Sequence, residues 1–161
     1  MLNFEDLYDS YAAEVYRFAL RLSGDRDDAQ DITSETFVRA WVHRSTIRTE
    51  TLKAYLFTIA RNLNLEQQRK RRHQVPLDVV YADSTPGPDR VAESQLELQR
   101  VQRLLDTLPE IDRSAFLLRV QHELPYAEIA RVLGLSLATA RVKVHRVRKR
   151  LIATRIDKEV R

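Results

Sequence analysis

The stretch LPYAEIARVLGLSLATARVKVHRVRKRL, residues 124–151, predicts two helices joined by a tight turn. Pro125 suits a first helical position, because the amide hydrogen that proline lacks would have no partner there. Gly134 can adopt the left-handed conformation that ends a helix, and Ser136 can cap the free amides of the next one. Together these signals predict a helix-turn-helix, a motif that places its second helix in the major groove of DNA.

The second of these helices combines an apolar stripe with a basic outer face. Its apolar residues recur at spacings of three and four, which predicts burial of Leu137, Ala140, Val144, Val147 and Leu151. Residues near the start of such a helix reach base edges, whereas later ones more often meet phosphates. We expect base contacts from Arg141, Val142, His145 and Arg146. The DNA-binding face also includes Thr139, and mainly backbone contacts are expected from Lys143, Arg148, Lys149 and Arg150. A solvated basic helix end is the competing interpretation.

The composition is that of a folded, helix-rich protein with uneven charge. Of 161 residues, 43% are apolar and 31% charged, and the net charge is +4. Residues 1–35 hold nine acidic against three basic residues, whereas 36–73 and 141–161 each hold nine basic against two acidic. This distribution predicts one acidic surface and two separate basic surfaces, which favours a polyanionic partner.

Several classes of protein are disfavoured by what the sequence lacks. The chain has no cysteine, which excludes disulfides and thiolate metal sites within it. It has no run of about 18 apolar residues, and its N-terminus is acidic rather than signal-like. We expect a cytoplasmic protein without membrane insertion, without a cofactor and without a bound metal.

The N-terminal part predicts three helices. They span residues 4–22, about 25–43 and about 52–71, with a polar connector at 44–50. The outer face of the second helix is acidic, and the third ends in four consecutive basic residues, 69–72, which favours a nucleic-acid contact.

The acidic outer face of the second helix allows three interpretations. It can be a solvated face that complements the helix dipole, or a docking surface for a basic partner. A magnesium site of an enzyme is the third, with ligands drawn from Asp25, Asp27, Asp28, Asp31 and Glu35. No lysine, histidine or glycine-rich element accompanies these carboxylates, so an enzyme is disfavoured.

Residues 75–89 hold three of the five prolines and predict a linker. A fourth helix at about 90–108 and a fifth that starts at Pro109 would brace the helix-turn-helix. The expected fold is all-α, with a three-helix domain at 1–74, the linker at 75–89 and a helix-turn-helix domain at 90–161. Such a linker permits both a closed and an extended form.

Three stretches, taken in order, resemble regions 2 and 4 of bacterial sigma factors of the sigma-70 family. They are DDAQDITSETFVRAW (27–41), TLKAYLFTIARNLNLEQQRKRRH (51–73), and LPEIDRSAFLLRV (108–120) followed by the helix-turn-helix. The short length resembles the extracytoplasmic-function (ECF) type. The resemblance implies a subunit that binds core RNA polymerase, directs it to promoter DNA and initiates transcription of a specific gene set. Family members are often held inactive by an anti-sigma factor, so such a partner is expected.

The resemblance also implies a role for each surface. The helix matching 27–41 docks on the polymerase clamp, which assigns core binding to Asp28, Asp31, Glu35, Phe37 and Trp41. The connector and the basic helix capture a flipped base of the minus-ten element. This assigns minus-ten contacts to Arg44, Ser45, Arg48, Thr49, Arg61, Asn62, Arg69 and Arg71. Base stacking there would rely on Tyr55, Phe57 or arginine planes. The recognition helix reads the minus-thirty-five element. The alternative is a stand-alone helix-turn-helix regulator, for which the basic third helix has no evident use.

Overall fold

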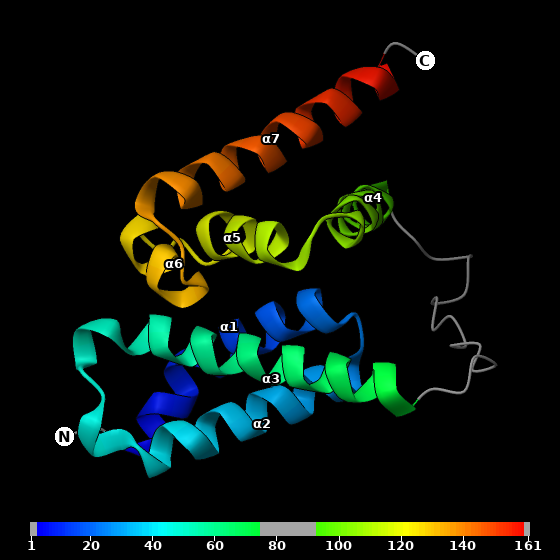
Figure 1. Cartoon of the computed structure of the whole chain (residues 1–161). Helices are drawn as coiled ribbons and strands as arrows, with labels where there is room; N and C mark the ends of the chain where they lie inside the picture. The colour runs from blue at the N-terminus through cyan, green and yellow to red at the C-terminus, as the bar shows by residue number, and fades with distance from the viewer. Residues whose placement is uncertain (1–2, 75–92, 160–161) are drawn as a thin grey trace.

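The computed structural model describes residues 3–74 and 93–159, and in these ranges all regular secondary structure is helical (Figure 1). The all-α prediction is confirmed. The predicted linker at 75–89 and residues 90–92 lie outside the described residues. The boundaries assigned to the two domains therefore stay predictions.

Three helices form the N-terminal bundle: α1 (Phe4–Ser23), α2 (Arg26–Val42) and α3 (Leu52–Gln74). Gly24 ends α1 with a φ of 71°, a left-handed conformation that glycine adopts without steric cost. The Asp25 carboxylate accepts a 3.0 Å hydrogen bond from the Asp28 amide and so caps α2. Between α2 and α3 the predicted connector forms two short 3-10 helices, η1 (Arg44–Thr46) and η2 (Thr49–Thr51).

Four helices form the C-terminal unit: α4 (Glu93–Thr107), α5 (Glu110–Val120), α6 (Tyr126–Leu133) and α7 (Leu137–Glu159). Gly134 ends α6 with a φ of 66°, and the Ser136 hydroxyl accepts a 3.1 Å hydrogen bond from the Thr139 amide. The helix-turn-helix is thus built as predicted. Pro109 and Pro125, however, are cap residues with extended backbone, not first helical residues, so α5 and α6 each begin one residue later.

Leu137, which was predicted to be buried, is exposed instead, as are two other apolar residues near helix ends. Leu96, Val120 and Leu137 are 44%, 46% and 42% exposed, respectively. Each lies in the first or last turn of its helix, where the apolar stripe runs past the neighbouring helices. A periodic pattern identifies the buried face of a helix but does not show where the neighbour that covers it stops.

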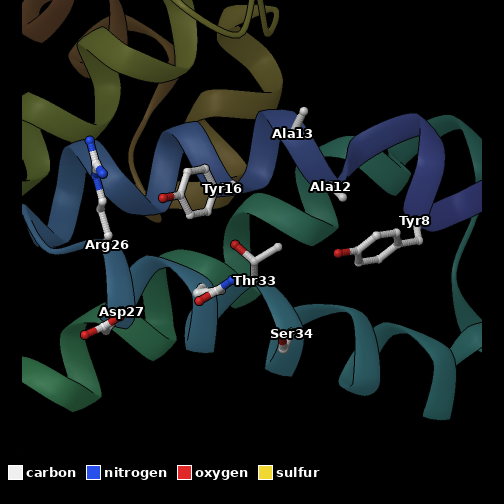
Figure 2. A pocket seen from close by; sticks show the side chains of 9 residues that line it. Tyr8, Ala12, Ala13, Tyr16, Arg26, Asp27, Thr33 and Ser34 are labelled. Atoms are coloured by element: carbon white, nitrogen blue, oxygen red, sulfur yellow. The ribbon is translucent and has the colours of Figure 1, made fainter.

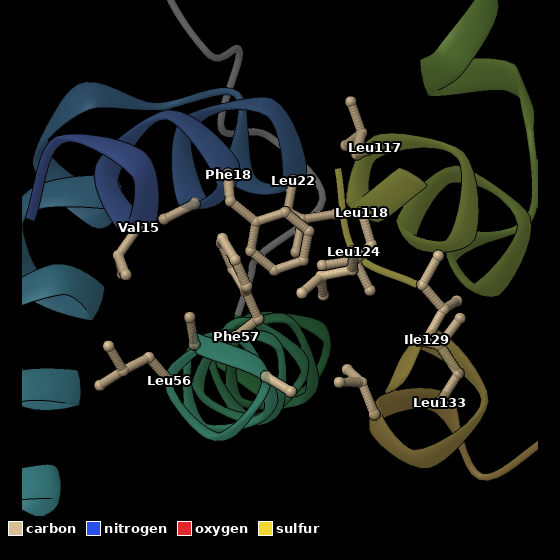
Figure 3. Packing of buried hydrophobic residues seen from close by; sticks show 14 of the residues in the cluster. Val15, Phe18, Leu22, Leu56, Phe57, Leu117, Leu118, Leu124, Ile129 and Leu133 are labelled. Carbon is tan, nitrogen blue, oxygen red and sulfur yellow. The ribbon is translucent and has the colours of Figure 1, made fainter. Parts of the chain in front are cut away.

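Side chains of the N-terminal bundle and the C-terminal unit form one continuous core. Figure 3 shows Phe18 and Leu22 of α1 and Phe57 of α3 pointing toward Leu118 and Leu124 of the C-terminal unit. In Figure 1, α5 and α6 lie against α1 and α3, whereas α7 lies on the far side. The chain is therefore in a closed form, one of the two that the sequence allows.

Candidate nucleic-acid and polymerase interfaces

The outer face of α7 is open to solvent and strongly basic. Helix α7 packs on α5 and α6 through buried Ala140, Val144 and Val147. The residues expected to read bases are all exposed, as are most of those expected to meet phosphates: Thr139, Arg141, Val142, His145, Arg146, Arg148, Lys149 and Arg150. A helix this exposed, with its first turn capped by Ser136, has the form needed to enter the major groove.

Two contacts hold basic side chains of α7 against the rest of the C-terminal unit. The Arg141 guanidinium lies 5.7 Å from the centre of the Tyr126 ring, which Arg119 also faces at 4.4 Å. Lys143 Nζ lies 2.7 Å from Asp112 Oδ1, and this lysine is only partly exposed. Lys143 thus departs from its predicted place on the free outer face, because α5 supplies an acidic partner.

The C-terminal end of α3 forms a second basic surface. Arg69, Lys70 and Arg72 are exposed there. Arg71 differs, because its guanidinium pairs with the Asp28 carboxylate of α2. That pairing also changes the interpretation of Asp28, which was expected to face outward: its side chain is only 13% exposed. Asp28 and Arg71 join two helices of the bundle instead of extending the acidic and basic surfaces.

The connector between α2 and α3 presents the predicted polar side chains. Arg44, Ser45, Arg48 and Thr49 are exposed. The Arg44 guanidinium lies 4.0 Å from the centre of the Trp41 ring and donates a 2.8 Å hydrogen bond to the Trp41 carbonyl. Phe57 is 1% exposed in this closed form, so here it does not offer its ring to a base, contrary to one of the options that the sequence left open. Tyr55 is half-buried, and Arg44 already forms a planar contact with an aromatic ring.

Asn62 and Arg61, adjacent on α3, are in different environments. Asn62 is exposed, whereas Arg61 forms an ion pair across the closed interface with Glu110 of α5. Arg61 Nε and Nη2 donate hydrogen bonds of 2.8 Å each to the two carboxylate oxygens. Burial alone raises the pKa of Glu110. The hydrogen bonds from Arg61 and Ser114, with the charges of Arg61 and Arg113, outweigh burial and lower that pKa below its ordinary value.

The acidic face of α2 is exposed at Asp27, Asp31 and Glu35. Glu35 pairs with Arg39 one turn along the helix, at 3.1 Å. Phe37, expected at the polymerase contact, is 1% exposed and packs edge-on against Tyr8 with ring centres 5.1 Å apart. Phe37 therefore supports α2 from inside and does not offer its ring to a partner. Trp41 is half-buried and packs edge-on against Phe4.

An open groove of about 510 Å³ runs between α1 and α2 (Figure 2). Tyr8 and Tyr16 line it from α1, and Asp27 and Ser34 line it from α2. The groove borders the exposed acidic face, so a partner helix lying on α2 would find both charged and apolar contacts there. In the described part of the chain, no group of three or more histidine, cysteine or acidic residues is arranged to hold a metal ion.

His122 is the feature that sequence reasoning missed. It lies two residues after the end of α5, in the turn that leads to α6, and its place in the sequence indicates no particular role. Its ring is fully buried, though, 4.6 Å from the centre of the Phe57 ring and 5.6 Å from that of Phe18. The only signal available in the sequence was a histidine two residues before Leu124 in a short turn, which does not reveal a partner more than 60 residues away.

Among residues 3–74 and 93–159, no helix is both long enough and apolar enough to cross a membrane.

Comparison with known proteins identifies both parts of the chain. Residues 7–74 match the model of sigma-70 region 2, and residues 98–151 match that of sigma-70 region 4. The ECF RNA polymerase sigma factor EcfG of Rhodopseudomonas palustris is 36% identical, over 84% of this chain and 76% of its own length. The ECF sigma factor SigE of Mycolicibacterium smegmatis is 33% identical over 94% of this chain, which spans only 61% of SigE.

A solved structure extends the match to three dimensions. The sigma factor RpoE of Bartonella quintana, determined in complex with the anti-sigma factor NepR, is 28% identical to this chain. The two superpose with a TM-score of 0.74 over 92% of this chain and 93% of RpoE. The ordered sequence motifs, the two helical parts and these relatives agree: the chain belongs to the extracytoplasmic-function type of the sigma-70 family of RNA polymerase sigma factors.

Proposed function

We propose that this chain binds core RNA polymerase through α2 and reads promoter DNA at two places, through the connector with α3 and through α7. The observation that carries the proposal is the presence of two exposed basic surfaces and one exposed acidic surface on separate helices of a sigma-factor chain. A stand-alone regulator needs one DNA-reading helix, whereas a sigma factor uses two DNA contacts and a polymerase contact.

The polymerase contact is proposed for the exposed carboxylates Asp31 and Glu35, with Asp27 beside the groove. Oriented charges of this kind steer and position a basic partner more than they add affinity. Trp41, half-buried at the end of α2, would add an apolar contact with the polymerase. Phe37 and Asp28 support this surface through packing and through the pair with Arg71, respectively.

The minus-thirty-five contact is proposed for α7. Arg141 and Arg146 carry the planar guanidinium that pairs with the O6 and N7 atoms of guanine, and Val142 offers an apolar contact for a thymine methyl. His145 lies on the same exposed face. Thr139 would contact DNA at the start of the helix, and Lys149 would bind phosphate further along.

The minus-ten contact is proposed for the connector and α3. Arg44, Ser45, Arg48 and Thr49 would surround an extruded base, and Asn62 would hydrogen-bond to it. Unstacked bases also stack on arginine guanidinium planes, and Arg44, which lies over Trp41, supplies such a plane. Arg69, with Lys70 and Arg72, would hold the phosphate backbone. Arg61 would join this surface when its pair with Glu110 is broken.

We further propose that the chain acts in the cytoplasm without catalysing a reaction itself, and that an anti-sigma factor holds it inactive. RpoE, of the same overall fold, was solved with such a partner. A pull-down of this chain with core RNA polymerase, followed by binding to genomic DNA fragments, tests the proposal. Retention of specific fragments only by the complex supports it. Equal retention by the free chain, with no polymerase bound, would indicate a stand-alone regulator.

A further inference from the structure

Two arginines of the C-terminal unit lie over one aromatic ring. Tyr126, the first residue of α6, is half-buried. The Cζ atom of Arg119, from the last turn of α5, lies 4.4 Å from the centre of its ring, and that of Arg141, from the second turn of α7, lies 5.7 Å from it. Both distances are within the range of about 6 Å at which an aromatic face attracts a cation. Three helices thus meet at one side chain, beside the residues proposed to read bases.

The backbone holds Arg119 in place. Its Nη1 atom donates a 3.2 Å hydrogen bond to the carbonyl of Leu124, a residue that is 2% exposed. The Leu124 amide in turn donates a 3.0 Å hydrogen bond to the Leu118 carbonyl of α5. Arg119 and the ring therefore form a fixed base, and the exposed Arg141 is the member of the group that can move.

The ring holds Arg141 without occupying its hydrogen-bond donors. Among the described residues Arg141 has no acidic partner, whereas Lys143 is paired with Asp112 at 2.7 Å. An ion pair of that kind would have to break before the charged group could bind a base. Attraction to an aromatic face needs no hydrogen bond, so the five N–H donors of Arg141 stay free for the acceptors of a guanine.

An exposed arginine normally loses much conformational freedom when it binds. Its long side chain samples many rotamers in water, and ordering it at an interface costs free energy. Contact with the Tyr126 ring restricts this sampling of Arg141 before DNA arrives, so less entropy is lost on binding. The restriction favours the base pairs whose acceptors match the held position, and it therefore increases selectivity as well as affinity.

We propose that Tyr126 is a positioning residue for base recognition: its ring, anchored by Arg119, holds the Arg141 guanidinium where it pairs with one guanine of the minus-thirty-five element. The inference rests on the proposed function, because it assumes that α7 reads that element. It adds a residue of α6 to those that determine the sequence preference. Tyr126 acts through Arg141 and not through a base contact of its own.

Variants of Tyr126 separate the effect of its ring from that of its hydroxyl. Tyr126→Phe keeps the ring, whereas Tyr126→Leu keeps an apolar side chain and removes the ring. Each full-length variant is assembled with core RNA polymerase, and circular dichroism checks its fold. The probe is a genomic fragment that the parent complex retains, with each base of the minus-thirty-five element changed in turn. Arg141→Ala and Arg146→Ala identify the positions that these two arginines read, and Tyr126→Leu is also combined with Arg141→Ala.

Arg141→Ala should lower base discrimination at one position about fivefold or more. Tyr126→Leu should lower it at that same position about threefold to tenfold, because the cost of ordering the arginine returns. The position read by Arg146 should keep its preference, and Tyr126→Phe should stay within about twofold of the parent chain. Adding Tyr126→Leu to Arg141→Ala should have no further effect.

Full discrimination in folded Tyr126→Leu, while Arg141→Ala loses it, would overturn the positioning role and leave the proposed function intact. Equal weakening on every fragment in both Tyr126 variants would overturn it too, because the hydroxyl would then be binding phosphate. An Arg141→Ala variant without a position-specific effect would also overturn the inference. Failure of the proposed function has a different form: the parent complex does not form or has no base preference, and the inference fails with it.

A second measurement needs no variant of the ring. In the free chain, NMR relaxation of the arginine Nε–H groups reports how far each side chain moves on the picosecond to nanosecond timescale. Arg146 is exposed on the same helix and contacts no aromatic ring of the described residues, so it is the matched reference. The order parameter of Arg141 should be clearly higher than that of Arg146. Equal order parameters would overturn the inference.

Discussion

Arg61 and Glu110 face each other through two parallel hydrogen bonds of 2.8 Å each, one residue from α3 and the other from α5. This pair ties a side chain expected to contact the minus-ten element to the unit proposed to read the minus-thirty-five element. A bidentate arginine–carboxylate pair is more directional than a lysine–carboxylate pair. It therefore fixes the relative orientation of the two parts in addition to holding them together.

Arg146→Ala should weaken binding to a promoter fragment by about 1–3 kcal/mol and relax the base preference at one upstream position. The reason is that Arg146 is exposed on the face of α7 expected to read bases. Competition binding with fragments that carry single base changes measures both the affinity and the base preference. Arg148→Ala is the matched control: a residue that meets phosphate weakens binding equally on all sequences and lowers the salt slope by about one. The base-reading role of Arg146 is wrong if its variant behaves like that of Arg148.

The double reversal Asp31→Lys and Glu35→Lys should weaken binding to core polymerase and leave the melting temperature almost unchanged. Both carboxylates are exposed, and loss of the Glu35–Arg39 pair costs only about 0.2–0.5 kcal/mol of stability. Fluorescence anisotropy with labelled chain gives the polymerase affinity. The double reversal Asp6→Lys and Asp9→Lys, at two exposed residues of α1, changes the net charge by the same amount and is the control. If the α1 control loses as much affinity for polymerase as the α2 variant, no docking surface exists on α2.

Asp28→Asn should act on stability instead. The Asp28 carboxylate is mostly buried and pairs with Arg71, so its neutralisation should lower the free energy of unfolding by about 1–3 kcal/mol. Polymerase affinity of the folded variant should change far less than in the Asp31 and Glu35 reversal. Urea unfolding, followed by circular dichroism, measures the free energy of unfolding. A variant with native stability and weak polymerase binding would return Asp28 to the docking surface.

The closed form should lose stability as the pH falls from about 6.5 toward 3. Burial lowers the pKa of His122 to about 3, with contributions from the positive charges of Lys53 and Arg17. Glu14, whose carboxylate oxygen lies 3.9 Å from the ring, is the acidic group that faces it. An exposed histidine keeps a pKa near 6.5, so between these values the open or unfolded chain binds a proton that the closed chain excludes. The stabilisation is complete above pH 6.5 and falls by up to about 1.4 kcal/mol per pH unit below it.

Urea unfolding at pH 7.5, 6.5 and 5.5 measures how the free energy of unfolding changes with pH. This range lies above the pH at which most carboxylates titrate. His122→Phe keeps an aromatic ring beside Phe18 and Phe57 and removes the titrating group. The free energy of unfolding of this variant should therefore change less with pH, by the His122 contribution. His43 and His145 are exposed in the parent chain and in the variant alike, so they cancel in the comparison. Identical slopes in the two proteins would show that His122 is not buried in the folded chain.

Local sequence signals predicted most of the fold and little of the interface. The left-handed glycine at Gly134 and the cap at Ser136 act within a few residues, so both were correctly predicted. The Asp28–Arg71 pair joins residues 43 positions apart. A periodic pattern does not show which charged residues on the polar faces of two helices will form an ion pair.

The same limit applies to the closed form as a whole. Apolar residues of α1, α3, α5 and α6 were assigned to the cores of two separate units, and nothing in their spacing distinguishes a core within one unit from a core shared by two. Phe57 illustrates this, because its ring contacts His122 of the other unit. The exposure of most residues of the candidate DNA and polymerase surfaces was predictable from charge and helix position. The contacts between the two units were not, since they join residues on opposite sides of the predicted linker.

Run-off transcription tests the central claim most directly. Purified core RNA polymerase is supplied with a pool of genomic promoter fragments, with and without this chain. We predict new transcripts that appear only when the chain is present, start a fixed distance downstream of two shared sequence elements, and are reduced by Arg146→Ala and by the Asp31 and Glu35 reversal. The same transcripts with core polymerase alone, or none with the chain while it still binds the fragments, would contradict its action as a sigma factor.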